Sequence, residues 1–184
     1  MALVVTAVVL PLVVVLLVLT RVLGGDDAGD RADDAVADVG ATPAPERADL
    51  PPLPVEVPPV TPEADANCPA LMGALPLELA GEQSRPVRSD SPYAYAWGEP
   101  PVVLVCGVER PAALEPTSPL IQVNGVEWLV DTTDPDSIVW TAVDRPVYVQ
   151  VTVSADTDSA PVTALGPVIT GTLPAQPVDA GGGG

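Results

Sequence analysis

Apolar and polar positions divide the chain into a continuous apolar run, a polar stretch and a region of alternating patterns. The apolar run covers residues 2–19 and is interrupted only by Thr6 and Pro11. As a helix that rises about 1.5 Å per residue, it is just long enough to cross the hydrocarbon core of a bilayer. We therefore expect a transmembrane anchor over residues 1–23. The alternative is a cleaved signal peptide, whose apolar core would be unusually long here.

Three further stretches have strand patterns. Residues 147–153 alternate between valines and polar or amphipathic side chains, the pattern of a strand buried on one face. Residues 101–105 are continuously apolar, as in a central strand covered on both faces. Residues 137–143 are rich in β-branched side chains and favour a strand over a helix.

A β-hairpin is predicted over residues 120–130. Asn124 and Gly125 separate two apolar stretches there, and this dipeptide suits a type I′ turn, in which both residues have positive φ. The register of such a hairpin places Ile121 opposite Trp128.

Two segments have helical character. Residues 69–75 are rich in Ala, Leu and Met and follow Asn67, a fair N-cap. Residues 160–169 form a weaker candidate, because Gly166 and Pro167 should kink or end the helix. The sequence thus predicts an α+β domain, a small and mostly antiparallel sheet with one or two short helices on one face. A transmembrane helix and a disordered linker precede it.

The domain boundaries follow composition. Residues 24–66 form an acidic and then proline-rich stretch, with eight prolines between positions 42 and 62. Such a stretch is expected to be a disordered linker with polyproline II character. The extracytoplasmic α+β domain is expected over residues 67–174, and residues 175–184 are a flexible, glycine-rich tail.

Charge and composition exclude several functions. The chain has 25 acidic residues against seven basic ones and a net charge of −18. Such a surface repels nucleic acid, so no nucleic-acid partner is expected. The chain has no histidine, which removes the commonest general base and the usual zinc ligand. Glycine-rich nucleotide motifs and the nucleophile-elbow motif are absent as well. We expect no cofactor, no metal site and no catalytic residues.

Cys68 and Cys106 are the only cysteines. An even number of cysteines in an extracytoplasmic domain favours a structural disulfide. In the chain-entropy model, closing a loop of this length stabilises a domain by about 4 kcal/mol. No Cys-x-x-Cys motif or basic neighbour suggests a redox role.

Aromatic side chains form one candidate contact surface, which comprises Tyr93, Tyr95, Trp97 and Trp128. Trp97 precedes the continuously apolar strand and could act as a stacking platform beside Glu99. The alternative is that Trp97 fills the core, because the chain has only three tryptophans and no phenylalanine.

Acidic side chains form a second candidate site. Glu99, Glu127 and Asp131 could serve as a carboxylate-based glycan hydrolase or sugar-binding site, but nothing in the sequence brings them together. Asp131, Asp134 and Asp136 gather in one loop, where oxygen ligands could hold calcium. The spacing, central glycine and bidentate glutamate of an EF-hand are absent, so a solvated turn is favoured.

Three short motifs carry a resemblance to a known family. They are Ala-Trp-Gly-x-Pro-Pro-Val-Val-Leu-x-Cys-Gly-Val over residues 96–108, Val-Asn-Gly-Val-x-Trp over 123–128, and Asp144-Arg145. Together with Cys68-Pro-Ala-Leu71, they resemble domain-of-unknown-function family 3515, which comprises actinobacterial membrane or secreted proteins. The resemblance covers residues 67–154. It implies a single-pass or secreted envelope protein with two matching cysteines, and it carries no catalytic residues to transfer.

These observations lead to one functional expectation and one alternative. We expect a single-pass cell-membrane protein whose C-terminal domain lies outside the cytoplasm and acts as a non-catalytic interaction module of the cell envelope. Its partner would be another envelope protein or a cell-wall polymer. Positively charged residues usually flank a membrane span on its cytoplasmic side, and Arg21 follows the apolar run, so the charge rule alone would place the C-terminal domain inside. The cysteines and the linker favour an outside domain, and we therefore expect the outside orientation. The alternative is the carboxylate-based glycan hydrolase or sugar-binding domain.

Overall fold

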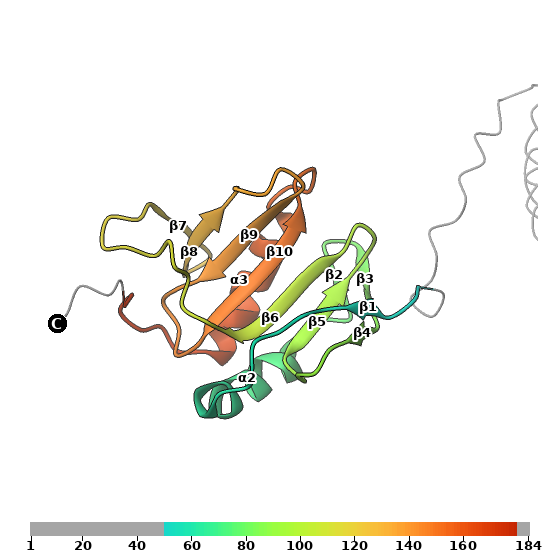
Figure 1. Ribbon diagram of the computed structural model, residues 1–184, viewed down its shortest axis with the longest axis horizontal. Helices are drawn as coiled ribbons and strands as arrows, with labels where there is room; N and C mark the ends of the chain where they lie inside the picture. The colour runs from blue at the N-terminus through green and yellow to red at the C-terminus, as the bar shows by residue number, and fades with distance from the viewer. Residues whose placement is uncertain (1–49, 180–184) are drawn as a thin grey trace, which may run out of the picture. The chain divides into compact units, whose positions relative to one another are not determined.

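The computed structural model describes residues 50–179 (Figure 1). The expected membrane anchor, most of the expected linker and the last residues of the tail lie outside this range. Within residues 50–179, no helix has the length and apolar character needed to cross a membrane.

An eight-stranded antiparallel sheet forms the centre of the domain, with strand order β2-β3-β5-β6-β10-β9-β8-β7. Its strands are β2 (Glu78–Leu79), β3 (Glu82–Arg85), β5 (Ala94–Trp97), β6 (Val102–Val108), β7 (Leu120–Val123), β8 (Val126–Asp131), β9 (Ser137–Ala142) and β10 (Tyr148–Ser154). A separate two-stranded parallel pair joins β1 (Leu53–Pro54) to β4 (Val87–Arg88).

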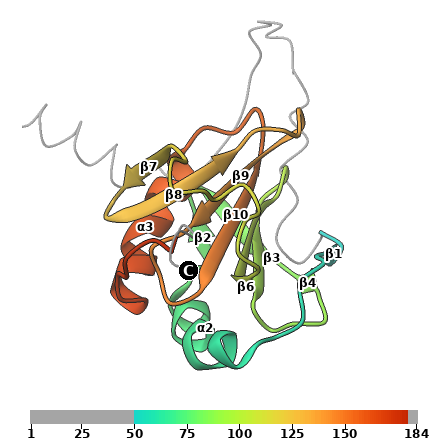
Figure 2. The ribbon, with the colours of Figure 1, turned by 60° about the vertical axis from the view of Figure 1, so that its left-hand side comes forward.

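Two helices, α2 (Pro62–Ala74) and α3 (Ala160–Thr172), pack on the same face of the sheet (Figure 1, Figure 2). Val149, Val151 and Val153 of β10 point toward them and are buried in the main core. We call this side of the sheet the helix face and the opposite side the outer face. The expected α+β class and mostly antiparallel sheet with two helices are confirmed, but the sheet has eight strands and is larger than the small sheet expected.

The segments with alternating, continuously apolar and hairpin patterns are all strands in the structure. The alternating stretch became β10, and the continuously apolar stretch became the central strand β6. Ile121 lies opposite Trp128, and Asn124 and Gly125 have φ values of 49° and 76°. The predicted hairpin register is therefore confirmed. Ile121 is 47% exposed because β7 is the last strand of the sheet.

The first helix begins earlier than expected. It starts after Thr61, whose side-chain oxygen accepts a hydrogen bond of 3.2 Å from the Ala64 amide, and Pro62 occupies the first turn. Both are strong start signals for a helix. Asn67, the expected N-cap, lies inside the helix and donates to the Glu63 carbonyl. The expectation of a helix limited to residues 69–75 is therefore wrong.

Residues 50–61, which we call the N-terminal segment, are ordered rather than linker-like. Amide hydrogen bonds run from Leu53 to the Pro86 carbonyl (2.9 Å) and from Val55 to the Arg88 carbonyl (3.0 Å). The prolines of this segment cannot donate, but the residues between them can, and the proline φ angle suits an extended edge strand. Ordered structure therefore precedes residue 67, where we expected the domain to begin.

The second helix continues through Gly166 and Pro167 to Thr172, so the expectation that this pair could end the helix is wrong. Pro167 has no amide hydrogen for the Thr163 carbonyl. The side-chain amide of Asn124 donates to that carbonyl instead, over 2.7 Å. Gly166 allows this approach, because an added Cβ there would lie 2.7 Å from the Asn124 Cβ.

Candidate functional site

The two tryptophans of the expected aromatic surface are core residues. Trp97 and Trp128 are fully buried on the helix face. The Trp97 indole donates to the Pro76 carbonyl over 2.9 Å, and Trp128 packs edge-on against Trp140. Neither ring is exposed to a partner. Trp97 fills the core, which was the alternative to a stacking platform.

The two tyrosines are also engaged within the domain. Tyr93 is 8% exposed, and its hydroxyl donates to a carboxylate oxygen of Asp65 on α2 over 2.7 Å. This hydrogen bond raises the pKa of Tyr93. Tyr95 is half-buried, with its ring centre 4.7 Å from that of Trp97. The four aromatic residues therefore do not form a shared exposed surface.

The structure does not bring the three candidate carboxylates together. Glu99 pairs with the buried Arg85 in the turn before β6, whereas Glu127 lies on β8 and accepts from Gln122. Strands β10 and β9 separate β6 from β8, so the strand that follows Glu99 and the strand that carries Glu127 lie roughly 14 Å apart. Asp131 lies four residues beyond Glu127 on the same strand, about 13 Å along it. Glycoside hydrolysis needs a carboxylate pair within about 5–10 Å.

The aspartates of the Asp131–Asp136 loop serve the loop itself. Asp131 accepts from the Thr133 amide over 2.8 Å, and hydrogen bonding from the Thr133 side chain and then from this amide lowers the pKa of Asp131. Asp134 accepts from the Asp136 amide over 2.9 Å and from the Ser137 hydroxyl over 3.1 Å. Across residues 50–179, no group of three or more histidine, cysteine or acidic residues is arranged to hold a metal ion.

The expected disulfide is present. Cys68 on α2 is bonded to Cys106 on β6, and the two Cα atoms are 5.8 Å apart. The bond fixes α2 to the central strand of the sheet.

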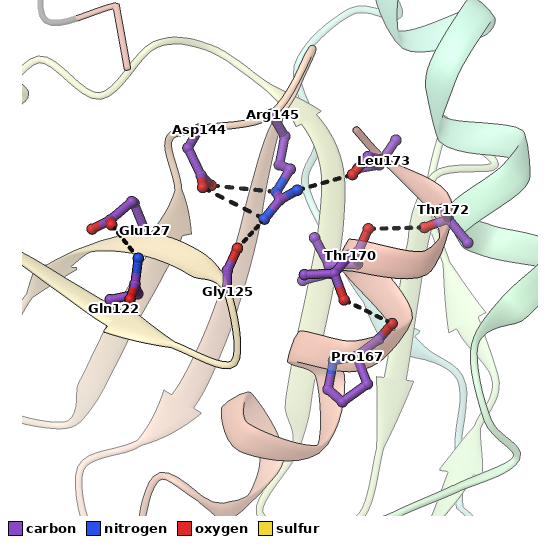
Figure 3. Close-up of polar contacts among 10 residues, drawn as sticks. Gln122, Gly125, Glu127, Asp144, Arg145, Pro167, Thr170, Thr172 and Leu173 are labelled. Atoms are coloured by element: carbon purple, nitrogen blue, oxygen red, sulfur yellow. Dashed lines mark hydrogen bonds and ion pairs between the residues drawn. The ribbon is translucent and has the colours of Figure 1, made fainter. Parts of the chain in front are cut away.

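A buried ion pair, Asp144 with Arg145, joins three parts of the domain (Figure 3). The Arg145 guanidinium donates to the Leu173 carbonyl at the end of α3 (3.0 Å) and to the Gly125 carbonyl in the hairpin turn, and it pairs with Asp144 over 3.3 Å. Burial raises the pKa of Asp144, although the Glu127 amide and Arg145 act in the opposite direction. Both charges are 7% exposed. Because they are paired and hydrogen-bonded within the fold, this cluster holds the hairpin against α3.

The outer face of the sheet carries an open groove of about 500 Å³, which we call the outer-face groove. Its lining includes loop residues Pro111 to Ala113 and, from the end of β8 onward, Asp131 to Thr133. The remaining lining residues are Glu109, Leu129, Val130, Val139, Thr141 and Gln150.

Packing beneath the loop fixes its position. Leu114 packs against Leu129 and Val143 in a small second core on the outer face. Arg110 donates to the Leu114 carbonyl and, over 3.2 Å, to the Asp179 carbonyl in the tail. The groove therefore has a preformed wall.

Two polar side chains in the groove have no hydrogen-bond partner within the described domain. Thr141 of β9 lies directly opposite Gln150 of β10, and Thr141 is only 4% exposed. Neither side chain makes a hydrogen bond to another residue of the range 50–179, and the Thr141 hydroxyl remains within reach of solvent. Sequence reasoning missed this site, because the pattern marks Gln150 only as a solvent-facing position and the loop that forms the wall has no strand or helix signal.

Comparison with known proteins gives one match. Neither a curated protein nor a solved structure matches the chain. The model of the family described as "Protein of unknown function (DUF3515)" matches residues 4–178. The chain therefore belongs to the DUF3515 family of proteins of unknown function.

Proposed function

We propose that this protein is a non-catalytic interaction module of the cell envelope. A single N-terminal transmembrane helix anchors it, and the domain of residues 50–179 contacts another envelope protein outside the cytoplasm. The observation that carries the proposal is the outer-face groove, whose wall is fixed and whose floor presents uncommitted polar groups at Thr141 and Gln150. Preformed clefts with a few convergent polar groups are the usual form of binding sites.

Sequence and disulfide support the proposed location. The apolar run of residues 2–19 is long enough to span a bilayer, and the family match begins at residue 4, so it includes most of this run. The Cys68–Cys106 bond suits an oxidising compartment outside the cytoplasm. The excess of carboxylates disfavours close contact with anionic headgroups.

The positions of the three carboxylates favour binding of a partner protein over the alternative of glycan hydrolysis or sugar binding. Glu99, Glu127 and Asp131 are dispersed along and across the sheet, and each is engaged in a local hydrogen bond. No aromatic ring lines the groove within the described domain, so a sugar would lack a stacking partner there.

Co-purification tests this proposal. The full chain would be isolated from native membranes in mild detergent, beside a Gln150→Ala variant and a Gln83→Ala variant as the matched control on β3. We expect one envelope protein to accompany the wild type and the control, and to be depleted with Gln150→Ala. Equal recovery with both variants, or recovery of glycan fragments alone, would contradict the proposal. Exposure of the domain to protease added to intact spheroplasts would test the orientation.

A further inference from the structure

We propose that the outer-face groove binds an extended, cationic peptide segment of the partner protein, with a lysine or arginine side chain held at its acidic rim. This inference rests on the proposed function and names the chemistry that the groove recognises. Charge and uncommitted hydrogen-bonding groups support it independently.

Charge at the groove favours a cation. Glu109 and Asp131 are exposed lining residues, and Asp134 and Asp136 follow Asp131 in the same loop. No arginine lines the groove within residues 50–179. The nearest exposed cation in sequence, Arg110, is bonded to the Leu114 and Asp179 carbonyls. A segment that carries positive charge would therefore be attracted to this rim and oriented by it.

The floor of the groove offers hydrogen bonds that suit a peptide backbone. Thr141 is more than nine-tenths buried, lines the groove and has no partner in the described domain, and Gln150 beside it supplies an amide donor and an amide acceptor. Each residue of an extended peptide carries one donor and one acceptor on its main chain. A backbone group of the ligand that bonds the Thr141 hydroxyl would add a hydrogen bond that no residue of the described domain makes.

The apolar part of the floor distinguishes a peptide from a glycan. Leu129 and Val139 lie beside Thr141 and Gln150, so small or branched apolar side chains of a peptide would pack between the polar contacts. A peptide of alternating lysine and valine fits this arrangement, because alternate side chains of an extended chain point in opposite directions.

Peptide binding to the full chain tests the inference. The protein would be held in nanodiscs of zwitterionic lipid, and the probe would be a fluorescent, end-capped octapeptide of alternating lysine and valine. A glutamate-valine octapeptide and a soluble peptidoglycan fragment would serve as comparison ligands. We expect the lysine peptide alone to bind, with an affinity that falls as salt is raised.

Two matched pairs of variants locate the binding. Asp131→Asn keeps the acceptor for the Thr133 amide and removes one charge, and Asp90→Asn makes the same change at an exposed position away from the groove. We expect Asp131→Asn to weaken binding about twofold to fivefold and Asp90→Asn to leave it unchanged.

The second pair tests the hydroxyl in the floor. Thr141→Val should weaken binding about threefold to tenfold, whereas Thr152→Val, on the same face but outside the groove lining, should not.

Several outcomes would overturn the inference. The lysine peptide could fail to bind, the two variants of each matched pair could weaken its binding equally, or the peptidoglycan fragment could bind more tightly than the peptide. If Thr141→Val unfolds the domain, the exposed Glu109→Gln and Asp131→Asn variants still decide the result. Loss of peptide binding together with retained, Gln150-dependent co-purification would reject the cationic ligand while leaving the proposed function in place.

Discussion

The side-chain amide of Asn124 donates a hydrogen bond of 2.7 Å to the Thr163 carbonyl, the carbonyl that Pro167 leaves without an intrahelical donor. A hairpin turn thus supplies the hydrogen bond that a proline removes from a helix. This contact explains how α3 continues through a Gly-Pro pair.

Asn124→Asp should destabilise the domain. Aspartate tolerates the positive φ of this position but cannot donate to Thr163, so we expect a loss of about 0.5–1.5 kcal/mol in the free energy of unfolding. Urea unfolding would measure it. Asn67→Asp is the control, because the half-buried Asn67 also donates an exposed hydrogen bond to a helix carbonyl. The Glu63 carbonyl it contacts can also take an intrahelical bond, so we expect little loss there. Equal losses at the two positions would contradict the explanation.

Coupling between Asn124 and Pro167 should be measurable. Pro167→Ala restores an amide hydrogen for the Thr163 carbonyl, so the Asn124 bond becomes redundant. We expect Asn124→Asp to cost less in the Pro167→Ala background, with a coupling free energy of about 0.5–1.5 kcal/mol in a double-mutant cycle. Additive effects would mean that the two residues do not share this carbonyl.

Gly107 and Gly73 should respond to alanine in opposite directions. Gly107 has a φ of +84°, and an added Cβ would lie 2.6 Å from the Ala64 Cβ on α2. Gly107→Ala should destabilise by about 2–4 kcal/mol, from backbone strain and overpacking together. Gly73, inside α2, has no atom within 4 Å of an added Cβ, so Gly73→Ala should stabilise by about 0.5–1 kcal/mol. Thermal unfolding of both variants would check this, and a stable Gly107→Ala protein would contradict the packing of α2 on β6.

The raised pKa of Asp144 should make its contribution to stability depend on pH. The folded domain holds this proton more tightly than the unfolded chain does, so the contribution is favourable at low pH and is lost as pH rises from about 4 through the raised folded pKa. The free energy of unfolding of the wild type minus that of Asp144→Asn should therefore fall as pH increases through this window.

Asp131, whose pKa is lowered, is the comparison. The free energy of unfolding of the wild type minus that of Asp131→Asn should rise with pH. Urea titrations at a series of pH values would compare the two signs, and a common sign would contradict the assignment.

Local signals in the sequence were sufficient for much of the sheet. The Asn124-Gly125 pair set the hairpin register, and the alternation over residues 147–153 separated the two faces of β10, because both depend on neighbours in sequence. The even cysteine count indicated the disulfide correctly.

Features that depend on distant residues could not be predicted in the same way. The continuation of α3 past Pro167 depends on a donor from Asn124, 39 positions before the acceptor Thr163. The N-terminal segment has a linker-like composition, yet its few amides pair with the sheet region at Pro86 and Arg88. The outer-face groove depends on how the β6–β7 loop packs through Leu114 on the outer face of the sheet, and no periodicity encodes that path.

The most direct test of the proposed interaction is site-specific photo-crosslinking in living cells. A photoreactive amino acid would replace Thr132 at the exposed rim of the groove and, as the control, Leu77, which is 65% exposed near the opposite edge of the sheet. Our account predicts one envelope protein crosslinked from position 132 through a lysine- or arginine-containing peptide, and none from position 77. Identical products from both positions, or no protein product from position 132, would contradict it.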